Sequence, residues 1–339
     1  MTIVEQKIEF LAELGRQLEN SLELSQLISR VSRKNPWFTE EFVSHSINAI
    51  VSQMLNRQKL SVWLSNYEAK SVKKTVALIF AGNVPLVGMH DYLCCYIAGC
   101  NIKLKLSSKD DELFPFVLNK LLEIDPALKT KVTLTEIVKD FDAVIATGSD
   151  NTNRYFEYYF KDYPRILRKN RNSIAIVTGQ ESEIKLQNLA NDIFMYFGFG
   201  CRNVSKLYVP VDYDLTRLFP AFEKRFSWMH SHNKYMSNYD YNRTILMLNK
   251  IPHLANEFVM INESASISSP IGCLHYETWH DKNILVSNIK KDLDKIQCVV
   301  VANPREWPAL SSVTIGEAQN PELWDYADGT DTLQFLFSL

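Results

Sequence analysis

The alternation of short apolar segments with helical patterns from residue 75 onward is the strongest constraint on how this chain folds. Residues 76–80 form a continuous apolar run typical of a buried strand, and residues 86–98 follow with the pattern of a buried helix. Strand-like segments recur at residues 102–106, 132–137, 143–147 and 173–177. This succession predicts a doubly wound α/β domain with a parallel sheet, in which ligands bind beyond the carboxyl ends of the strands.

The length of 339 residues exceeds what one hydrophobic core usually serves, so we expect two closely packed domains. The first, residues 1–178, would combine N-terminal helices with the parallel sheet. The second, residues 179–339, would be another α/β unit that closes with a C-terminal strand. Its expected strands lie near residues 205–210, 244–248, 273–279, 297–302 and 331–337.

Charge and hydropathy narrow the classes of partner. The net charge is −2 and charged residues are spread along the chain, which argues against nucleic acid and favours small molecules or protein subunits. The N-terminal residues lack a secretory pattern, so we expect a cytoplasmic protein. The longest apolar stretch, residues 75–100, contains Asn83, Pro85, His90 and Asp91, so we expect no membrane span.

Cys201 is the most informative of six cysteines, because glycines at positions 198 and 200 leave its thiol accessible. The following Arg202 would favour the thiolate, which is the nucleophilic form. The alternative is a buried structural cysteine. The cysteine count does not indicate a disulfide framework in a chain with no export signal, and the histidines lack the spacing of a zinc site, so we expect no metal.

Polar and glycine-containing turns follow three of the expected strands. They lie at residues 81–85, 105–108 and 146–149. Each is a weak signal alone, because such turns are usually ordinary chain reversals. In a parallel sheet, however, all three would converge at one edge.

These segments together resemble the aldehyde dehydrogenase superfamily and, within it, the fatty acyl-CoA reductase family known from bacterial bioluminescence. The resemblance rests on residues 82–86, 102–108, 146–149 and 172–176 and on the segment around Cys201. They occur in the family's order with similar spacing. The resemblance implies a Rossmann-type domain that binds a nicotinamide dinucleotide and a catalytic domain that holds the cysteine.

The resemblance also implies roles for individual residues. Cys201 would attack a thioester carbonyl to form an acyl-enzyme, and the Asn83 side chain would stabilise the oxyanion together with the Cys201 N–H. Lys105 would contact the adenine ribose of the cofactor. Gly148 and Ser149 would form the turn that opens a helix toward the pyrophosphate.

Two departures from the superfamily pattern bear on the reaction. Ser108 stands where many relatives that prefer NAD carry a glutamate, so we expect NADPH as the hydride donor, with NADH as the alternative. Residues 166–172 hold no carboxylate where hydrolytic relatives carry the base that activates water. This favours exchange with CoA and reduction of a thioester over oxidation of an aldehyde to an acid.

The function we expect is therefore reduction of a fatty acyl-CoA to an aldehyde with NADPH. The alternatives are a cysteine-dependent acyltransferase, a reductase of another activated acyl group, or an inactive subunit that binds acyl groups or cofactor. The expected partners are acyl-CoA and either further copies of the chain or an acyl-activating protein. The proton donor stays open among His230, His232 and Glu263.

Overall fold

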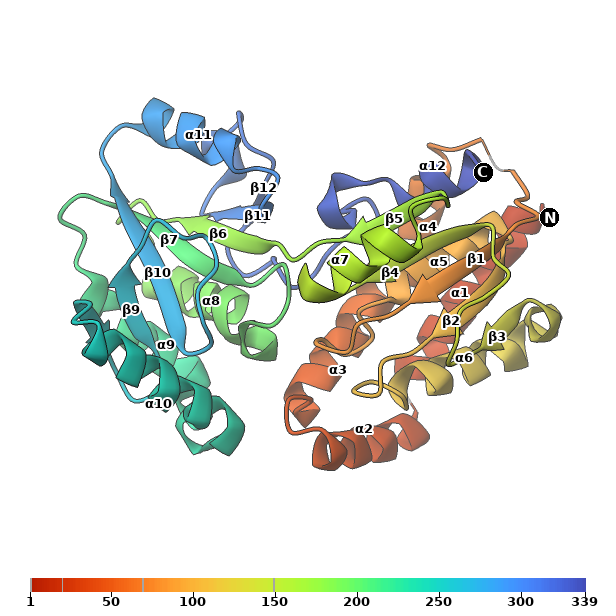
Figure 1. Ribbon diagram of the computed structural model, residues 1–339, viewed down its shortest axis with the longest axis horizontal. Helices are drawn as coiled ribbons and strands as arrows, with labels where there is room; N and C mark the ends of the chain where they lie inside the picture. Colours follow the sequence, from red (N-terminus) through yellow and green to blue (C-terminus); the bar gives the residue numbers. More distant parts are fainter. Residues whose placement is uncertain (1, 20, 69, 149) are drawn as a thin grey trace. The chain divides into compact units, whose positions relative to one another are not determined.

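The computed structural model consists of two compact units (Figure 1). It describes residues 2–19, 21–68, 70–148 and 150–339, with the side chains of residues 150 and 151 left aside. The first unit comprises residues 1–170 and 320–339, and the second comprises residues 171–319. The division thus falls after residue 170, where a boundary after residue 178 was expected, because residues 172–176 pair into the second sheet.

The sheet of the first unit confirms the expected doubly wound α/β fold. Its strands pair in the order β3-β2-β1-β4-β5, and every pairing is parallel. The strands are β1 (Thr75–Ile79), β2 (Asn101–Lys105), β3 (Val132–Leu134), β4 (Ala143–Thr147) and β5 (Arg165–Arg168). The short edge strand β5 was not expected from the sequence, since its arginines flank only two apolar residues.

Helices cover both faces of this sheet. They are α1 (Ile3–Glu19), α2 (Leu22–Lys34), α3 (Glu40–Ala49), the π-helical turn η1 (Ile50–Met54), α4 (Arg57–Leu64), α5 (Met89–Ala98), α6 (Leu113–Ile124), η2 (Pro126–Thr130), α7 (Asp150–Tyr159), η7 (Ala327–Gly329) and α12 (Thr332–Phe337). Val76 and Leu78 of β1 pack in one cluster with α1, α5 and α6. Ala77 and Ile79 face the other way, toward Phe156 of α7. The period-two alternation along β1 therefore divides the core between two layers.

The C-terminal segment corrects one expectation, because residues 332–337 form helix α12 and not a strand. Asp331 caps this helix by accepting a 2.8 Å hydrogen bond from the Gln334 N–H. Leu333 and Leu336, which are three residues apart, are buried on one helical face, and α12 packs against α5. The segment therefore completes the core of the first unit.

The second unit is built on a seven-stranded sheet in the order β12-β11-β6-β7-β10-β9-β8. All pairings are parallel except that of β8 with β9. The strands are β6 (Asn172–Ile176), β7 (Val204–Pro210), β8 (His253–Ala255), β9 (Met260–Glu263), β10 (Cys273–Trp279), β11 (Ile296–Val301) and β12 (Ser312–Thr314). Ile174 and Ile176 pack with Leu285 and Ile289 of the covering helix α11 (Lys282–Lys291).

The helices of the second unit correct a second expectation. They are α8 (Glu183–Phe194), η3 (Met195–Gly198), η4 (Leu215–Arg217), α9 (Leu218–Phe226), η5 (Ser227–Ser231), α10 (Asn233–Leu248), α11 (Lys282–Lys291) and η6 (Pro304–Glu306). Residues 244–248, expected as a strand, form the last turn of α10. The buried residues of α10, Tyr235, Tyr239 and Leu246, have helical spacing. Residues 244–248 taken alone show only a short apolar run, which fits a strand equally well. Within the described ranges, no helix combines the length and apolar character needed to cross a bilayer.

A buried ion pair joins three elements of the first unit. Arg168, at the end of β5, is 4% exposed, and its Nη2 donates to Asp91 Oδ1 of α5 and to Thr332 Oγ1 of α12, each at 2.7 Å. Its Nη1 donates to the Ala327 carbonyl. Loss of either partner of such a pair leaves an uncompensated buried charge, so the network holds α12 against the sheet.

Replacing Arg168 tests this network. We expect Arg168→Met to lower the free energy of unfolding by about 3 to 5 kcal/mol, because the Asp91 carboxylate would remain buried without its partner. Urea denaturation followed by circular dichroism measures the change. Arg16→Met, which removes the exposed pair with Glu13, is the control and should leave the midpoint nearly unchanged. Equal effects of the two variants would contradict the assignment.

Candidate active site

The carboxyl edge of the first sheet gathers most of the expected site residues. Because β1, β2 and β4 run parallel, the turns that follow them lie at the same edge, with β1 in the middle. The turn with Asn83 follows β1, Ser108 follows β2, and Gly148 comes directly after β4. The strand order reverses between β1 and β4, which is the place where doubly wound sheets bind ligands.

The β1 and β2 turns lie in close contact. A Cβ atom built on Gly82 would be 2.5 Å from Ser107 Oγ and 2.8 Å from Lys109 Cβ. Only glycine fits at this position without displacing the β2 turn. The approach brings Asn83 and the Ser108 turn to one short stretch of the edge.

Two side chains hold the half-buried turn that carries Asn83. Ser46 of α3 donates to the Pro85 carbonyl at 2.8 Å, and Asp110 Oδ2 accepts from the Leu86 N–H at 2.8 Å. Leu86 has a φ of 56°, in the left-handed region. Burial raises the pKa of the Asp110 carboxyl to about 6. The backbone around Asn83 is thus fixed by groups outside the turn.

Lys105, at the end of β2, has an acidic neighbour that sequence reasoning missed. Its Nζ donates to the Glu136 carbonyl at 2.6 Å and lies 3.7 Å from the Glu136 carboxylate. Glu136 follows β3, so only the pairing of β3 with β2 brings it to Lys105. Ser108, three residues after Lys105 in the sequence, is exposed. This end of the sheet therefore pairs a lysine with a carboxylate from the neighbouring strand.

The β4 turn is held by Asn153 of α7, whose Nδ2 donates to the carbonyls of Gly148 at 3.3 Å and Arg168 at 2.7 Å. A Cβ atom built on Gly148 would lie 3.0 Å from side-chain atoms of Thr152 and Phe156. The helix that follows starts directly beyond this glycine, as expected for a turn that presents a helix N-terminus. Ser149, the other expected residue of the turn, lies outside the described residues.

Cys201 belongs to the second unit and lies on a turn between α8 and β7. Tyr196, Phe197 and Gly198, which precede it, have φ values of 53°, 54° and 79°. Consecutive left-handed residues that are not glycine are costly, and such backbone persists where surrounding contacts hold it. Cys201 is half-buried, whereas the other five cysteines are buried. The structure therefore makes Cys201 the most accessible thiol of the chain.

Asn203 closes the turn that carries Cys201. Its side chain is 1% exposed, and its Nδ2 donates to the carbonyls of Asp192, Ile193 and Met195 at 3.3, 3.2 and 2.7 Å. Its Oδ1 accepts from the Gly200 N–H at 2.8 Å. These bonds satisfy the carbonyls at the end of α8, which would otherwise lack partners. One amide thus joins the helix end to the turn that carries Cys201.

Further contacts hold the two residues that precede Asn203. Ser173 Oγ of β6 donates to the Cys201 carbonyl at 3.1 Å, and the Arg202 Nε donates to the Ala318 carbonyl. The pairing of β6 with β7 shifts register here, so that Ser205 forms a bulge next to the turn. Bulges reorient side chains and are common beside active sites.

The backbone of residues 265–267 is held by side chains of the sheet. Its three carbonyls accept in turn from Lys206 Nζ at 2.9 Å, His275 Nδ1 at 3.0 Å and Ser205 Oγ at 2.6 Å. Lys206 is fully buried and pairs with Glu277, and burial lowers the pKa of His275. Sequence reasoning missed this set, because only the register of β7 with β10 makes Lys206 and His275 neighbours.

The histidines considered as proton donors have structural contacts. His232 caps α10 by accepting from the Tyr235 N–H at 3.1 Å, and its ring centroid lies 4.4 Å from that of Phe197. His230 is exposed and contacts the Ser227 carbonyl through its Nδ1. Glu263, at the end of β9, is exposed. Over the described ranges, no group of three or more histidine, cysteine or acidic residues is arranged to hold a metal.

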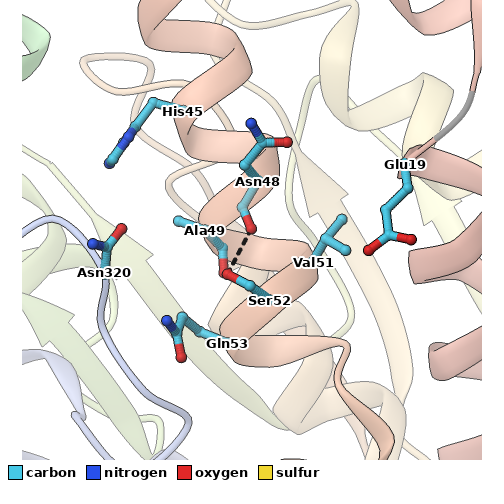
Figure 2. A pocket seen from close by; sticks show the side chains of 8 residues that line it. All are labelled: Glu19, His45, Asn48, Ala49, Val51, Ser52, Gln53 and Asn320. Carbon is cyan, nitrogen blue, oxygen red and sulfur yellow. Dashed lines mark hydrogen bonds between the residues drawn. The ribbon is translucent and has the colours of Figure 1, made fainter.

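A cavity of about 330 Å³ lies in the first unit, along the end of α3 and the π-helical turn η1 (Figure 2). Its lining residues are Glu19, His45, Asn48, Ala49, Val51, Ser52, Gln53 and Asn320. The cavity includes none of the residues expected at the cofactor site. Ser46, adjacent to His45 in sequence, links α3 to the Asn83 turn.

Comparison with known proteins identifies a family and a fold. Residues 6–217 match the family model described as acyl-CoA reductase (LuxC). No curated protein matches the sequence. Among solved structures, an aldehyde dehydrogenase from Bacillus cereus in complex with NAD+ is similar with a TM-score of 0.66 and 12% identity, over 93% of this chain and 76% of that one.

Two further structures agree with this fold. Aldehyde dehydrogenase 21 from Physcomitrella patens, in complex with succinate, has a TM-score of 0.68 and 14% identity over 100% of this chain and 84% of that one. The aldehyde dehydrogenase KauB from Pseudomonas aeruginosa has a TM-score of 0.64 and 13% identity, covering 93% and 76%. The expected aldehyde dehydrogenase fold is confirmed.

The contacts of Asn203 lead to a stability prediction. We expect Asn203→Ala to lower the free energy of unfolding by about 3 kcal/mol, because buried carbonyls and the Gly200 N–H lose their partner. Asn238→Ala removes only one bond, to the Lys234 carbonyl within α10, and should cost less than about 0.5 kcal/mol. Urea titration measures both variants. A loss at Asn203 no larger than that at Asn238 would show that the amide does not hold the turn.

Proposed function

We propose a reaction for this chain on the premise that it belongs to the acyl-CoA reductase (LuxC) family, whose model matches residues 6–217. The chain is thus an oxidoreductase that acts on acyl or aldehyde groups. We infer that it reduces a fatty acyl-CoA thioester to the aldehyde with NADPH, through an acyl group carried on Cys201. The observation that carries the inference is the half-buried thiol of Cys201 on a turn held by Ser173 and Asn203.

The first half of the proposed reaction is acyl transfer. The Cys201 thiolate attacks the thioester carbonyl carbon, a new C–S bond forms, and the bond to the CoA sulfur breaks as CoA leaves and takes up a proton. The Cys201 N–H stabilises the oxyanion that forms on the carbonyl oxygen, and the side-chain amide of Asn83 stays the second donor that the family resemblance predicts. The arginine next to Cys201 favours the thiolate before attack.

The second half is reduction. When bound, the nicotinamide cofactor supplies the hydride that converts the acyl group on Cys201 to the thiohemiacetal level. The thiohemiacetal then collapses, the C–S bond breaks, and the aldehyde leaves while Cys201 returns to the thiolate. Release of the aldehyde readies Cys201 for another acyl group.

The carboxyl edge of the first sheet suits such a cofactor. Gly82 permits the close approach of the β1 and β2 turns, and Gly148 leads into the N-terminus of α7, where phosphate oxygens bind favourably. Lys105 would meet the adenine ribose, with Ser108 beside it, and Ser149 remains a predicted contact. The Bacillus cereus enzyme with the same fold is described as an NAD+ complex. These features support a nicotinamide dinucleotide in this unit.

The choice of reduction over hydrolysis is supported by Arg168. This residue lies in the segment where hydrolytic relatives would carry a general base. Its guanidinium is buried and pairs with Asp91. A buried, paired arginine cannot accept a proton from water. An acyl group on Cys201 would therefore persist until the hydride arrives or CoA returns.

The assay for this function combines the purified protein with a long-chain acyl-CoA and NADPH. We expect release of CoA together with loss of NADPH absorbance, and we expect Cys201→Ala to abolish both. Cys273→Ala, at a buried thiol of the same unit, is the matched control and should keep both. CoA release without oxidation would indicate an acyltransferase. Absence of both CoA release and NADPH oxidation would favour another activated acyl group as the substrate, or a subunit that only binds.

Glu136 provides a test of the hydride donor. Its carboxylate beside Lys105 would repel a 2′-phosphate, so Glu136→Gln should lower the KM for NADPH relative to that for NADH. We expect a change of roughly two- to fivefold, the range for exposed charges. Steady-state kinetics with both donors measure it, and Glu123→Gln on α6 is the control. An unchanged ratio of the two KM values would show that the 2′-phosphate of NADPH does not bind near Glu136.

A further inference from the structure

Asp192 is a buried acid that the proposed reaction leaves unexplained. It lies in α8, it is 0% exposed, and its carboxylate accepts from the N–H groups of Gly316 at 2.6 Å and Ala318 at 3.0 Å. Burial raises the pKa of this carboxyl to about 7, while the two N–H groups and Arg202 oppose the rise and Glu317 adds to it. A fully buried carboxylate is costly to retain for packing alone.

The residues that Asp192 holds are in contact with the turn that carries Cys201. The Ala318 N–H donates to Asp192, and the Ala318 carbonyl accepts from the Arg202 Nε. Ala318 itself is buried. The carboxylate therefore determines where this carbonyl lies, and the carbonyl in turn determines where the Arg202 guanidinium lies.

The backbone of Asp192 is also connected to Gly200, the residue before Cys201. Its carbonyl oxygen accepts from Asn203 Nδ2, and the Asn203 Oδ1 accepts from the Gly200 N–H. Gly200 and Arg202 flank Cys201 in the sequence. A single residue thus connects, by hydrogen bonds, to both neighbours of the proposed nucleophile.

We propose that Asp192 is a positioning residue for Cys201: its carboxylate fixes residues 316–318, the Ala318 carbonyl holds the Arg202 Nε, and the arginine that follows Cys201 is thereby kept in one place, where it favours the thiolate. The inference rests on the proposed role of Cys201 as nucleophile. It concerns the reactivity of the free thiol, before any substrate binds. A guanidinium held near a cysteine lowers the free energy of the thiolate relative to the thiol, whereas a mobile one is solvated instead.

The experiment is alkylation of the intact protein by iodoacetamide, with the modified peptide identified by mass spectrometry from about pH 6 to about pH 9. The other five cysteines are buried, so the fast reaction reports Cys201. We expect Asp192→Asn, which replaces one acceptor oxygen with an NH₂ group, to slow alkylation near neutral pH by about tenfold. The pH at the midpoint of the rate profile should rise by about one pH unit, since a shift of one pH unit corresponds to a tenfold change in the fraction of thiolate.

Glu181→Gln is the matched control. Glu181 is 4% exposed in the same unit, and its carboxylate accepts from the N–H groups of Thr178 at 2.8 Å and Gly179 at 3.0 Å. It lies beyond the carboxyl end of β6, whereas Ser173, which contacts Cys201, lies near the amino end. The control should leave the profile unchanged. Equal slowing in both variants, or a wild-type profile in folded Asp192→Asn, would overturn the proposal.

A second variant covers the case in which Asp192→Asn does not fold. Arg202→Lys keeps the positive charge but lacks the Nε donor to Ala318, and we expect a similar shift of the profile. The double variant should be no slower than either single one, because both changes act through Ala318. Losses that multiply would refute the connection. These measurements need neither acyl-CoA nor NADPH, so they can fail while the reductase assay succeeds, or the reverse.

Discussion

Parallel pairing of β1 with β2 and β4 is the constraint on which the arrangement of the first unit depends. Parallel neighbours require crossover helices, and those helices place the carboxyl ends of all the strands at one edge. Gly82, Ser108 and Gly148 lie far apart in the sequence and share this edge only for that reason. The absence of a side chain at Gly82 then lets two turns touch, so the same glycine that permits the fold also shapes the expected cofactor site.

In the second unit, hydrogen bonds from side chains to backbone groups fix the positions of the loops. Asn203 satisfies carbonyls at the end of α8 and at the same time closes the turn before β7. Residues 265–267 are held in the same manner, through carbonyls that accept from Lys206, His275 and Ser205. Buried polar networks of this kind are stabilising only when every member has a partner, which makes their geometry specific. The turn that carries Cys201 is therefore held by the side chains of Asn203 and Ser173.

The buried charges divide into two kinds. Arg168 and Asp91 join secondary elements of the first unit through a buried ion pair. Asp192 accepts only backbone N–H groups, and the segment that it holds contacts Arg202. Burial of the Arg168–Asp91 pair and of the Asp192 carboxylate costs free energy. Each is therefore best explained by the segment that it holds in place. In a chain of this family, stability and reactivity would then depend on different carboxylates.

The sequence by itself determined the fold class, the first four strands and the N-terminal helices, because apolar periodicity is a local property. It also predicted an accessible thiol at Cys201, which is half-buried while the other five cysteines are buried. It did not determine the helical state of residues 244–248 and 332–337, since short apolar runs fit either structure until their packing partners are known. Only the tertiary structure placed Glu136 beside Lys105 and Asp192 beside Ala318, because strand register and loop closure join residues that no sequence pattern relates.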